Sequence, residues 1–130
     1  MSESIIPNPV GWFEVYVDNM PRAQAFYEKV FDQTLTSLLD PSDDSIQMYA
    51  FTADMTQYGA SGALVHTKEV SAGNNSTIVY FSCVDCSIEE SRVVDAGGKV
   101  ERHKMSLGEH GFCSMVIDTE GNMIGLHSQK

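Results

Sequence analysis

The stretch GWFEVYVDNMPRAQAFYEKVF, residues 11–31, predicts a strand that leads through a helix cap into a helix. Its residues 12–17 are apolar, aromatic or β-branched apart from the carboxylate of Glu14, which is typical of a mostly buried strand. Asn19 can cap the helix that follows, and Pro21 falls in the first turn, where a missing N–H costs no hydrogen bond. The strand is therefore expected to end sharply, with the helix directly after it.

The predicted helix carries a single apolar stripe with a spacing of three and four residues. Its members are Met20, Ala23, Phe26, Tyr27 and Val30. A stripe of this kind packs against a flat apolar surface. We therefore expect the helix to lie on a β-sheet.

The chain beyond this helix continues as three strands and then starts again. Strands are predicted over residues 34–39, 46–52 and 63–66, with a turn at 40–44. Residues 70–76, VSAGNNS, are rich in turn formers and form the best linker. A second buried strand over 78–84 then leads to a helix with the capping box Ser87 to Glu90 and a glycine stop at 96–98. Strands at 99–105, 112–118 and 123–127 complete an internal repeat of about 65 residues.

The repeat and two motifs give the sequence a resemblance to a known superfamily. The motifs are Val17–Tyr27, VDNMPRAQAFY, and Asp118–Leu126, DTEGNMIGL. With them the chain resembles the vicinal oxygen chelate superfamily, which includes glyoxalase I, bleomycin-resistance proteins and extradiol dioxygenases. The resemblance implies a single α+β domain over residues 1–130, made of two βαβββ modules that form one curved mixed sheet with a central cleft. Module one covers about 8–69, the linker about 70–76 and module two about 77–130.

The same resemblance bears on metal binding. Metal-dependent members place four ligands on the concave face, and the matching positions here are Trp12, Ala63, Val79 and Gly125. None of these side chains binds a divalent ion, which needs His, Glu or Gln donors at this site. We therefore expect no metal cofactor. The missing ligands also argue against the metal-dependent glyoxalase and dioxygenase reactions.

The candidate site residues follow from strand alternation and from the cleft that the resemblance implies. Alternation places Trp12, Glu14 and Tyr16 on one face, and by analogy Val79, Phe81 and Cys83 in the second module. His127 shares a face with Gly125, so Glu14 and His127 are predicted to meet as an acid–base pair. The loop 104–111 is a candidate lid. The predicted catalytic residues are Glu14 and His127, and the predicted ligand contacts are Trp12, Tyr16, Phe81, Cys83 and Lys104.

Composition limits the partners. The chain has 130 residues and a formal net charge of −10 at pH 7, which repels nucleic acid and anionic lipid. The amino-terminal sequence lacks the pattern of an export signal, and no apolar run is long enough to span a membrane. These features predict a cytoplasmic protein that binds neither nucleic acid nor membranes. The resemblance adds the expectations of a small-molecule partner and of a homodimer.

Three functions remain open. The first is a binding protein that holds a small molecule in its cleft without the usual metal, and the second is a lyase or isomerase that uses Glu14 as general base. The third is a thiol redox protein, because Cys83 and Cys86 form a CxxC pair. Redox chemistry requires a thiol with a lowered pKa, as occurs at a helix N-terminus. Cys83 instead falls inside a predicted strand.

Overall fold

The computed structural model describes residues 8–40, 42–54 and 56–130. Module one contains β1 (Phe13–Tyr16), α1 (Met20–Phe31), β2 (Thr36–Ser37), β3 (Ile46–Ala50) and β4 (Gly62–Thr67). Module two contains β5 (Tyr80–Ser82), α2 (Cys86–Arg92), β6 (Lys99–Ser106), a 3₁₀ turn (Gly108–His110), β7 (Phe112–Ile117) and β8 (Met123–Ser128). The amino-terminal segment behind the export-signal prediction, and Pro41 of the predicted turn, lie outside the described residues.

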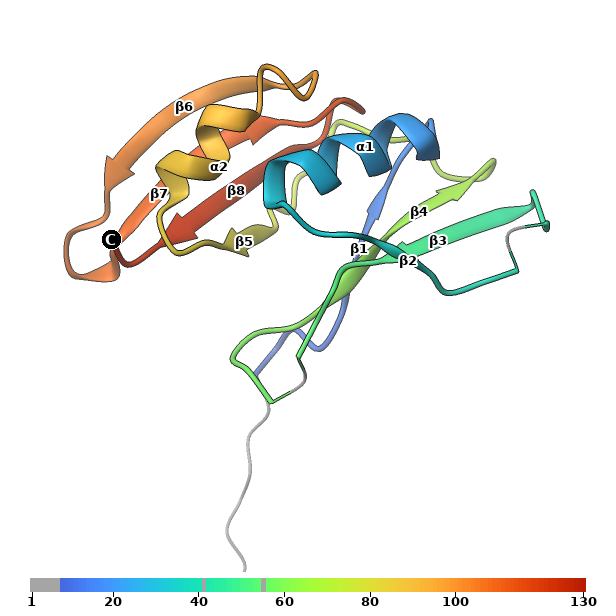
Figure 1. Ribbon diagram of the computed structural model, residues 1–130, viewed down its shortest axis with the longest axis horizontal. Helices are drawn as coiled ribbons and strands as arrows, with labels where there is room; N and C mark the ends of the chain where they lie inside the picture. Colours follow the sequence, from blue (N-terminus) through green and yellow to red (C-terminus); the bar gives the residue numbers. More distant parts are fainter. Residues whose placement is uncertain (1–7, 41, 55) are drawn as a thin grey trace, which may run out of the picture.

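The strands form two four-stranded mixed sheets, one from each module (Figure 1). The orders are β1-β4-β3-β2 and β5-β8-β7-β6, with β1 parallel to β4 and β5 parallel to β8. The α+β class and the two βαβββ modules are thus confirmed. The single curved sheet that the resemblance implied is instead two sheets. The edge strands β1 and β5, with four and three residues, are not paired with each other, and side chains make the contact between the modules. The rings of Phe13 and Phe81 meet edge to face at a centroid distance of 5.6 Å.

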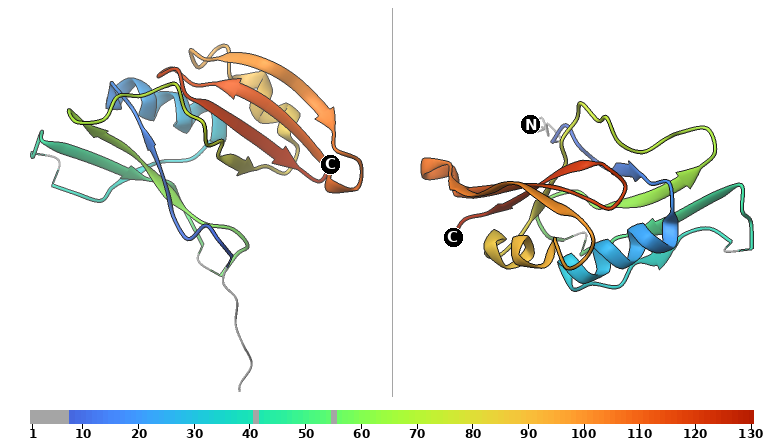
Figure 2. Two further views of the ribbon diagram at one scale, coloured as in Figure 1. Left: turned by 180° about the vertical axis from the view of Figure 1, so that it is seen from behind. Right: turned by 90° about the horizontal axis from the view of Figure 1, so that it is seen from above.

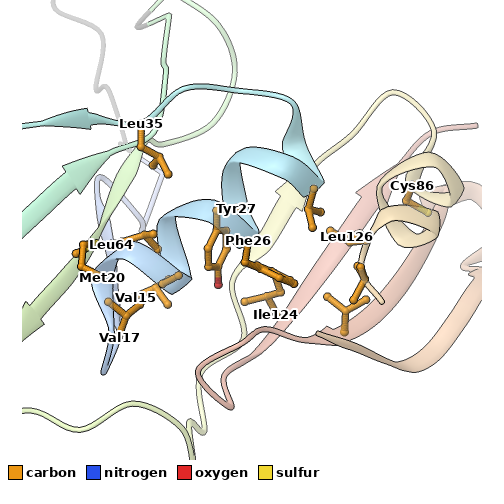
Figure 3. Close-up of a cluster of buried hydrophobic side chains, with 14 residues drawn as sticks. Val15, Val17, Met20, Phe26, Tyr27, Leu35, Leu64, Cys86, Ile124 and Leu126 are labelled. Carbon is orange, nitrogen blue, oxygen red and sulfur yellow. The ribbon is translucent and has the colours of Figure 1, made fainter. Parts of the chain in front are cut away.

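Both helices lie on the same side of the two sheets, and the linker runs on the opposite side (Figure 2). Asn19 caps α1 as predicted, since its Oδ1 accepts a hydrogen bond of 3.0 Å from the backbone N–H of Arg22. All five residues of the predicted stripe are buried. Figure 3 shows Phe26 and Tyr27 of this stripe among core side chains from both modules. No helix in the described ranges has the length and apolar character that a membrane span needs.

The cap of α2 differs from the prediction. Asp85, not Ser87, is the N-cap, and its Oδ1 accepts hydrogen bonds from the N–H and the hydroxyl of Ser87. The side-chain bond from Ser87 and the bond from Lys104 hold the pKa of Asp85 at about 2. Glu90 turns away from the cap and accepts a 2.7 Å bond from the N–H of Lys104. The helix starts two residues earlier than predicted because the side chain of Asp85 already supplies an acceptor for the N–H of Ser87.

The late motif ties module two to module one. The buried carboxylate of Asp118 accepts a 2.6 Å bond from the hydroxyl of Tyr27, which lies on α1. It also accepts bonds of 2.8 and 2.9 Å from the backbone N–H groups of Glu120 and Asn122. Asn122 in turn donates a 2.9 Å bond to the carbonyl of Tyr16 on β1. The start of β8 is thereby fixed beside β1.

Glu120 completes this tie at the cap of α1. Its Oε1 accepts 2.9 Å bonds from the N–H groups of Asp18 and Asn19. Arg22 adds a bidentate pair, with Nε at 2.6 Å from Oε2. The Glu120 side chain has no exposed surface, so these partners replace its hydration.

Candidate functional site

Glu14 and Tyr16 lie on the face of β1 that points away from the helices, and Trp12, directly before the strand, lies on the same side. The indole Nε1 of Trp12 donates a 3.2 Å hydrogen bond to Oε2 of Glu14, and the hydroxyl of Tyr16 donates a 2.9 Å bond to Oε1. The alternate residues Phe13 and Val15 pack on the hydrophobic core. The predicted alternation of this strand is confirmed. Glu14 is therefore held between two aromatic side chains, each two residues away in the chain.

This carboxylate lines a hollow of about 290 Å³, which we call the Glu14 hollow. Its walls come from β1, the start of β8 and the linker, and they include Phe13, Glu14, Val15, Tyr16, Val70, Ser71, Gly73, Asn75, Thr77, Val79, Asn122, Met123 and Ile124. The apolar side chains and the linker's amide groups together give a surface suited to a small organic ligand.

The linker is a fixed wall of this hollow. The N–H of Gly73 donates a 2.7 Å bond to Oδ1 of Asn122. The side chain of Asn75 bonds both backbone groups of Met123, accepting from its N–H and donating to its carbonyl at 3.0 Å each. Sequence reasoning treated this segment only as a connection between modules, because its composition indicates turns and says nothing of their partners.

Phe81 and Cys83 do not lie on the face that was predicted for them. Phe81 packs into the core, with ring centroids 4.6 Å from Phe31 and 5.3 Å from Phe51, and Cys83 also packs against the core. Tyr80 takes the opposite face, paired with Gly125 on β8. Residues 78–81 are apolar without alternation, so the pattern could not fix the phase of β5. Sequence reasoning therefore missed Tyr80.

Lys104 lies on the helix side of the second sheet and not at the mouth of a cleft. Its Nζ donates a 2.9 Å bond to Oδ1 of Asp85 and sits 4.7 Å from the centroid of the Phe112 ring. Two register shifts between β6 and β7 precede Met105 and change which side chains face the helices. The residues expected to form a lid instead end β6 and form the 3₁₀ turn.

His127 shares a face with Gly125, as predicted, but it is not brought to Glu14. Its Nε2 lies 2.7 Å from the carbonyl oxygen of His110. Along β8, His127 lies roughly 10 Å beyond Ile124 at about 3.3 Å per residue, and Ile124 is where the strand lines the Glu14 hollow. Glu14 is hydrogen-bonded to Trp12 and Tyr16 instead, and His127 is hydrogen-bonded to the backbone of His110.

The side chains at the positions that match the metal ligands of the vicinal oxygen chelate superfamily are unsuited to a divalent ion in this chain. Ala63 lies opposite Glu14 in the β1–β4 ladder and offers no donor. A Cβ at Gly125 would stand 2.3 Å from Cδ2 of Tyr80, so the tyrosine ring occupies the place of a ligand side chain. Residues 8–40, 42–54 and 56–130 contain no group of three or more His, Cys, Asp or Glu placed to hold an ion. We derive no chemistry through a divalent metal.

The CxxC pair has an environment unlike that of a redox site. Burial, with a smaller contribution from Glu89, raises the pKa of the Cys83 thiol to about 12. Cys86 stands at the start of α2 but has no exposed surface. A raised pKa keeps Cys83 as the unreactive thiol at neutral pH, opposite to what thiol redox chemistry requires.

Titration of Tyr16 reports on the contact with Glu14. The hydrogen bond to Glu14 raises the pKa of Tyr16, and burial raises it further. We expect the phenol to ionise above its usual value of about 10, and the Glu14→Gln variant to bring the pKa back toward that value, since the carboxylate charge is gone. Ultraviolet absorbance of the phenolate, taken as the difference from a Tyr16→Phe variant, measures this. An unchanged pKa in Glu14→Gln would contradict the contact.

Known structures share this fold. Glyoxalase I from Zea mays superposes with a TM-score of 0.73 at 19% identity, over 98% of this chain and 48% of that one. A glyoxalase-related enzyme from Fulvimarina pelagi gives 0.65 at 16% identity, over 94% and 88% of the two chains. A glyoxalase/bleomycin resistance protein from Albidiferax ferrireducens T118 gives 0.65 at 13%, over 95% and 100%.

These matches identify the fold as that of the vicinal oxygen chelate superfamily, which confirms the resemblance at the level of the fold. This chain spans about half the length of the maize glyoxalase I chains that it matches. No protein-family model matches the sequence, and no curated protein matches it either. At identities below 25% the likeness concerns architecture, so function has to be argued from the site.

Proposed function

We propose that the protein binds a small, mostly apolar molecule in the Glu14 hollow, without a divalent metal, and that Glu14 anchors a hydroxyl or ammonium group of that molecule. The observation that carries this proposal is the carboxylate of Glu14, fixed by Trp12 and Tyr16 on the wall of a hollow of about 290 Å³. A hollow near the lower end of the usual range suits a ligand of modest size.

The hydrogen bonding of Glu14 supports this choice of ligand. Each carboxylate oxygen accepts one bond from the protein, from Trp12 or from Tyr16. A carboxylate offers about four acceptor positions, so capacity remains for a donor on the ligand. An anionic ligand would be repelled by Glu14. The apolar side chains of Val70, Val79 and Met123, which also line the hollow, favour a hydrocarbon body.

The test uses three probes that share one ring, namely benzylamine, benzyl alcohol and benzoate. Trp12 is the chain's only tryptophan and bonds to Glu14, so its fluorescence reports binding. After treatment with a chelator we expect benzylamine and benzyl alcohol to bind and benzoate not to bind. Glu14→Gln should weaken benzylamine by about 10- to 100-fold, which corresponds to losing a charged hydrogen bond.

Matched controls separate the site from general effects. The side chain of Glu109 is 89% exposed and lies on the 3₁₀ turn, so Glu109→Gln should leave the affinities unchanged. Calorimetry repeats the measurement for variants in which the environment of Trp12 changes. Equal binding of all three probes would remove Glu14 from recognition. Binding that appears only after a divalent ion is added would overturn the metal-free proposal.

A catalytic role for Glu14 is the second candidate, favoured by its direct bond to a proton donor, the Tyr16 hydroxyl. A lyase or isomerase of small oxygenated substrates would begin with Glu14 removing a proton from a carbon beside a carbonyl. Hydrogen–deuterium exchange at that carbon of hydroxyacetone, followed by NMR, separates the two functions. An enzyme gives exchange that Glu14→Gln abolishes, whereas a binding protein gives no exchange above buffer with either chain.

A further inference from the structure

A row of three sulfur and nitrogen donors crosses the second sheet, apart from the Glu14 hollow. Met105 on β6 lies directly opposite Cys113 on β7, and Cys113 lies directly opposite His127 on β8. These strands are neighbours in the sheet, as Figure 1 shows. Side chains at directly opposed positions leave the same face, with Cβ atoms about 4.5–5.5 Å apart. A thioether, a thiol and an imidazole are therefore adjacent.

Two members of the row, Met105 and Cys113, line a second hollow on the face away from the helices. This methionine hollow has a volume of about 520 Å³, and its lining includes Met105, Cys113, Met115 and Met123. Cys113 is only 6% exposed, and the hollow gives its thiol a path to solvent. Sulfur is thus the prevailing donor atom on this face.

The hydrogen bond of His127 to a backbone carbonyl leaves the other ring nitrogen, Nδ1, able to bind a metal ion. A backbone carbonyl only accepts, so Nε2 of His127 carries the proton in its 2.7 Å contact with His110. In the neutral ring Nδ1 then holds the lone pair. Histidines that bind metals characteristically donate their other N–H to a carbonyl or carboxylate, which fixes the ring and its tautomer. His127 already has this arrangement.

We propose that Met105, Cys113 and His127 form a site for a soft monovalent cation, Cu(I) or Ag(I). Thioether and thiolate donors select such ions, whereas hard divalent ions prefer oxygen. Binding exchanges the thiol proton of Cys113 for the metal ion, so one proton is released to solvent as the metal–sulfur bond forms. The site is separate from the Glu14 hollow and stands independently of the function proposed for that hollow.

Charged neighbours of the row are compatible with a cation. Nη1 of Arg102 lies 3.9 Å from Sδ of Met105, and this exposed guanidinium has to swing away when the ion binds. Glu101 lines the same hollow and offsets the charge of Arg102. The net charge of −10 makes the chain as a whole attractive to cations.

The test is an anaerobic competition between the full chain and bicinchoninate for Cu(I), followed by the colour of the copper–bicinchoninate complex. We expect the wild type to withdraw one Cu(I) per chain. Cys113→Ser should lower the affinity by about 100-fold, and His127→Gln and Met105→Leu by about 10-fold each, since changing even a hydrogen-bond partner of a metal ligand typically costs about 10- to 100-fold. Zn²⁺ at equal concentration should not displace Cu(I).

Control variants distinguish the row from other sulfur atoms. Cys83→Ser and Met48→Leu change a thiol and a methionine outside the row and should keep the wild-type affinity. Met105 is partly exposed, so we expect Met105→Leu to keep the fold. This variant therefore tests the proposed site even if circular dichroism shows that Cys113→Ser does not fold. The proposal is overturned if the wild type withdraws no Cu(I), if Cys83→Ser loses as much affinity as Cys113→Ser, if Met105→Leu and Met48→Leu behave alike, or if Zn²⁺ displaces Cu(I).

Discussion

Replacing Asp118 by alanine is expected to lower the free energy of unfolding by about 4 kcal/mol, because it leaves several buried donors without an acceptor at roughly 1–3 kcal/mol each. The donors are the hydroxyl of Tyr27, the N–H groups of Glu120 and Asn122, and Nδ2 of Asn122. Tyr27 is only 1% exposed, so water cannot replace its partner without opening the core. Urea denaturation followed by circular dichroism measures the loss.

Two further variants show that the loss comes from this network. Asp44 is exposed, so Asp44→Ala should change stability by no more than about 0.5 kcal/mol. In a double-mutant cycle, Tyr27→Phe should cost much less in the Asp118→Ala background than in the wild type, since its partner is already gone. Additive losses for Tyr27→Phe and Asp118→Ala would contradict the contact between the two modules.

The second large effect concerns the neighbouring residues Tyr80 and Phe81 on β5. Phe81→Ala should destabilise the fold by about 3 kcal/mol, because its ring fills space among the aromatic rings of the core. Tyr80 is 51% exposed on the opposite face, so Tyr80→Ala should cost less than about 1 kcal/mol. Thermal unfolding of the two variants compares adjacent positions of one strand. A larger loss for Tyr80→Ala would mean that β5 presents its other face to the core.

The variants Tyr80→Ala and Phe81→Ala also distinguish an effect on stability from an effect on the methionine hollow. Tyr80 lines that hollow and covers Gly125, whereas Phe81 lies on the core side. We expect Tyr80→Ala to make Cys113 more accessible to a thiol reagent while the fold is retained. The carboxylate of Glu14 lines the other hollow, so benzylamine binding should be the same in Tyr80→Ala and in the wild type.

Local patterns predicted the features that depend on one element at a time. The stripe on α1 is buried residue for residue, and Asn19 caps the helix, because both depend on helical spacing and nearby backbone groups. The face of β1 that carries Glu14 was also predicted, because successive side chains of a strand point to opposite faces and Glu14 is the one carboxylate among residues 12–17. The two-module order followed from the repeat.

Features that join distant segments could not be read from one element. The phase of β5 depended on the core that receives Phe81, because an unbroken apolar run has no preferred face. The direction of Lys104 depended on irregular pairing between β6 and β7. In the sequence Cys113 was only a third cysteine in an odd count, and strand register placed it between Met105 and His127.

The sequence by itself determined the two βαβββ modules, the cap and stripe of the first helix, and the carboxylate of Glu14 on the face away from that helix. Only the tertiary structure decided that the linker is a wall of the Glu14 hollow and that His127 stands apart from Glu14. The physical reason is range. Helical and strand periodicity act over a few residues, whereas hollows and donor sets depend on the register between strands that are distant in the chain.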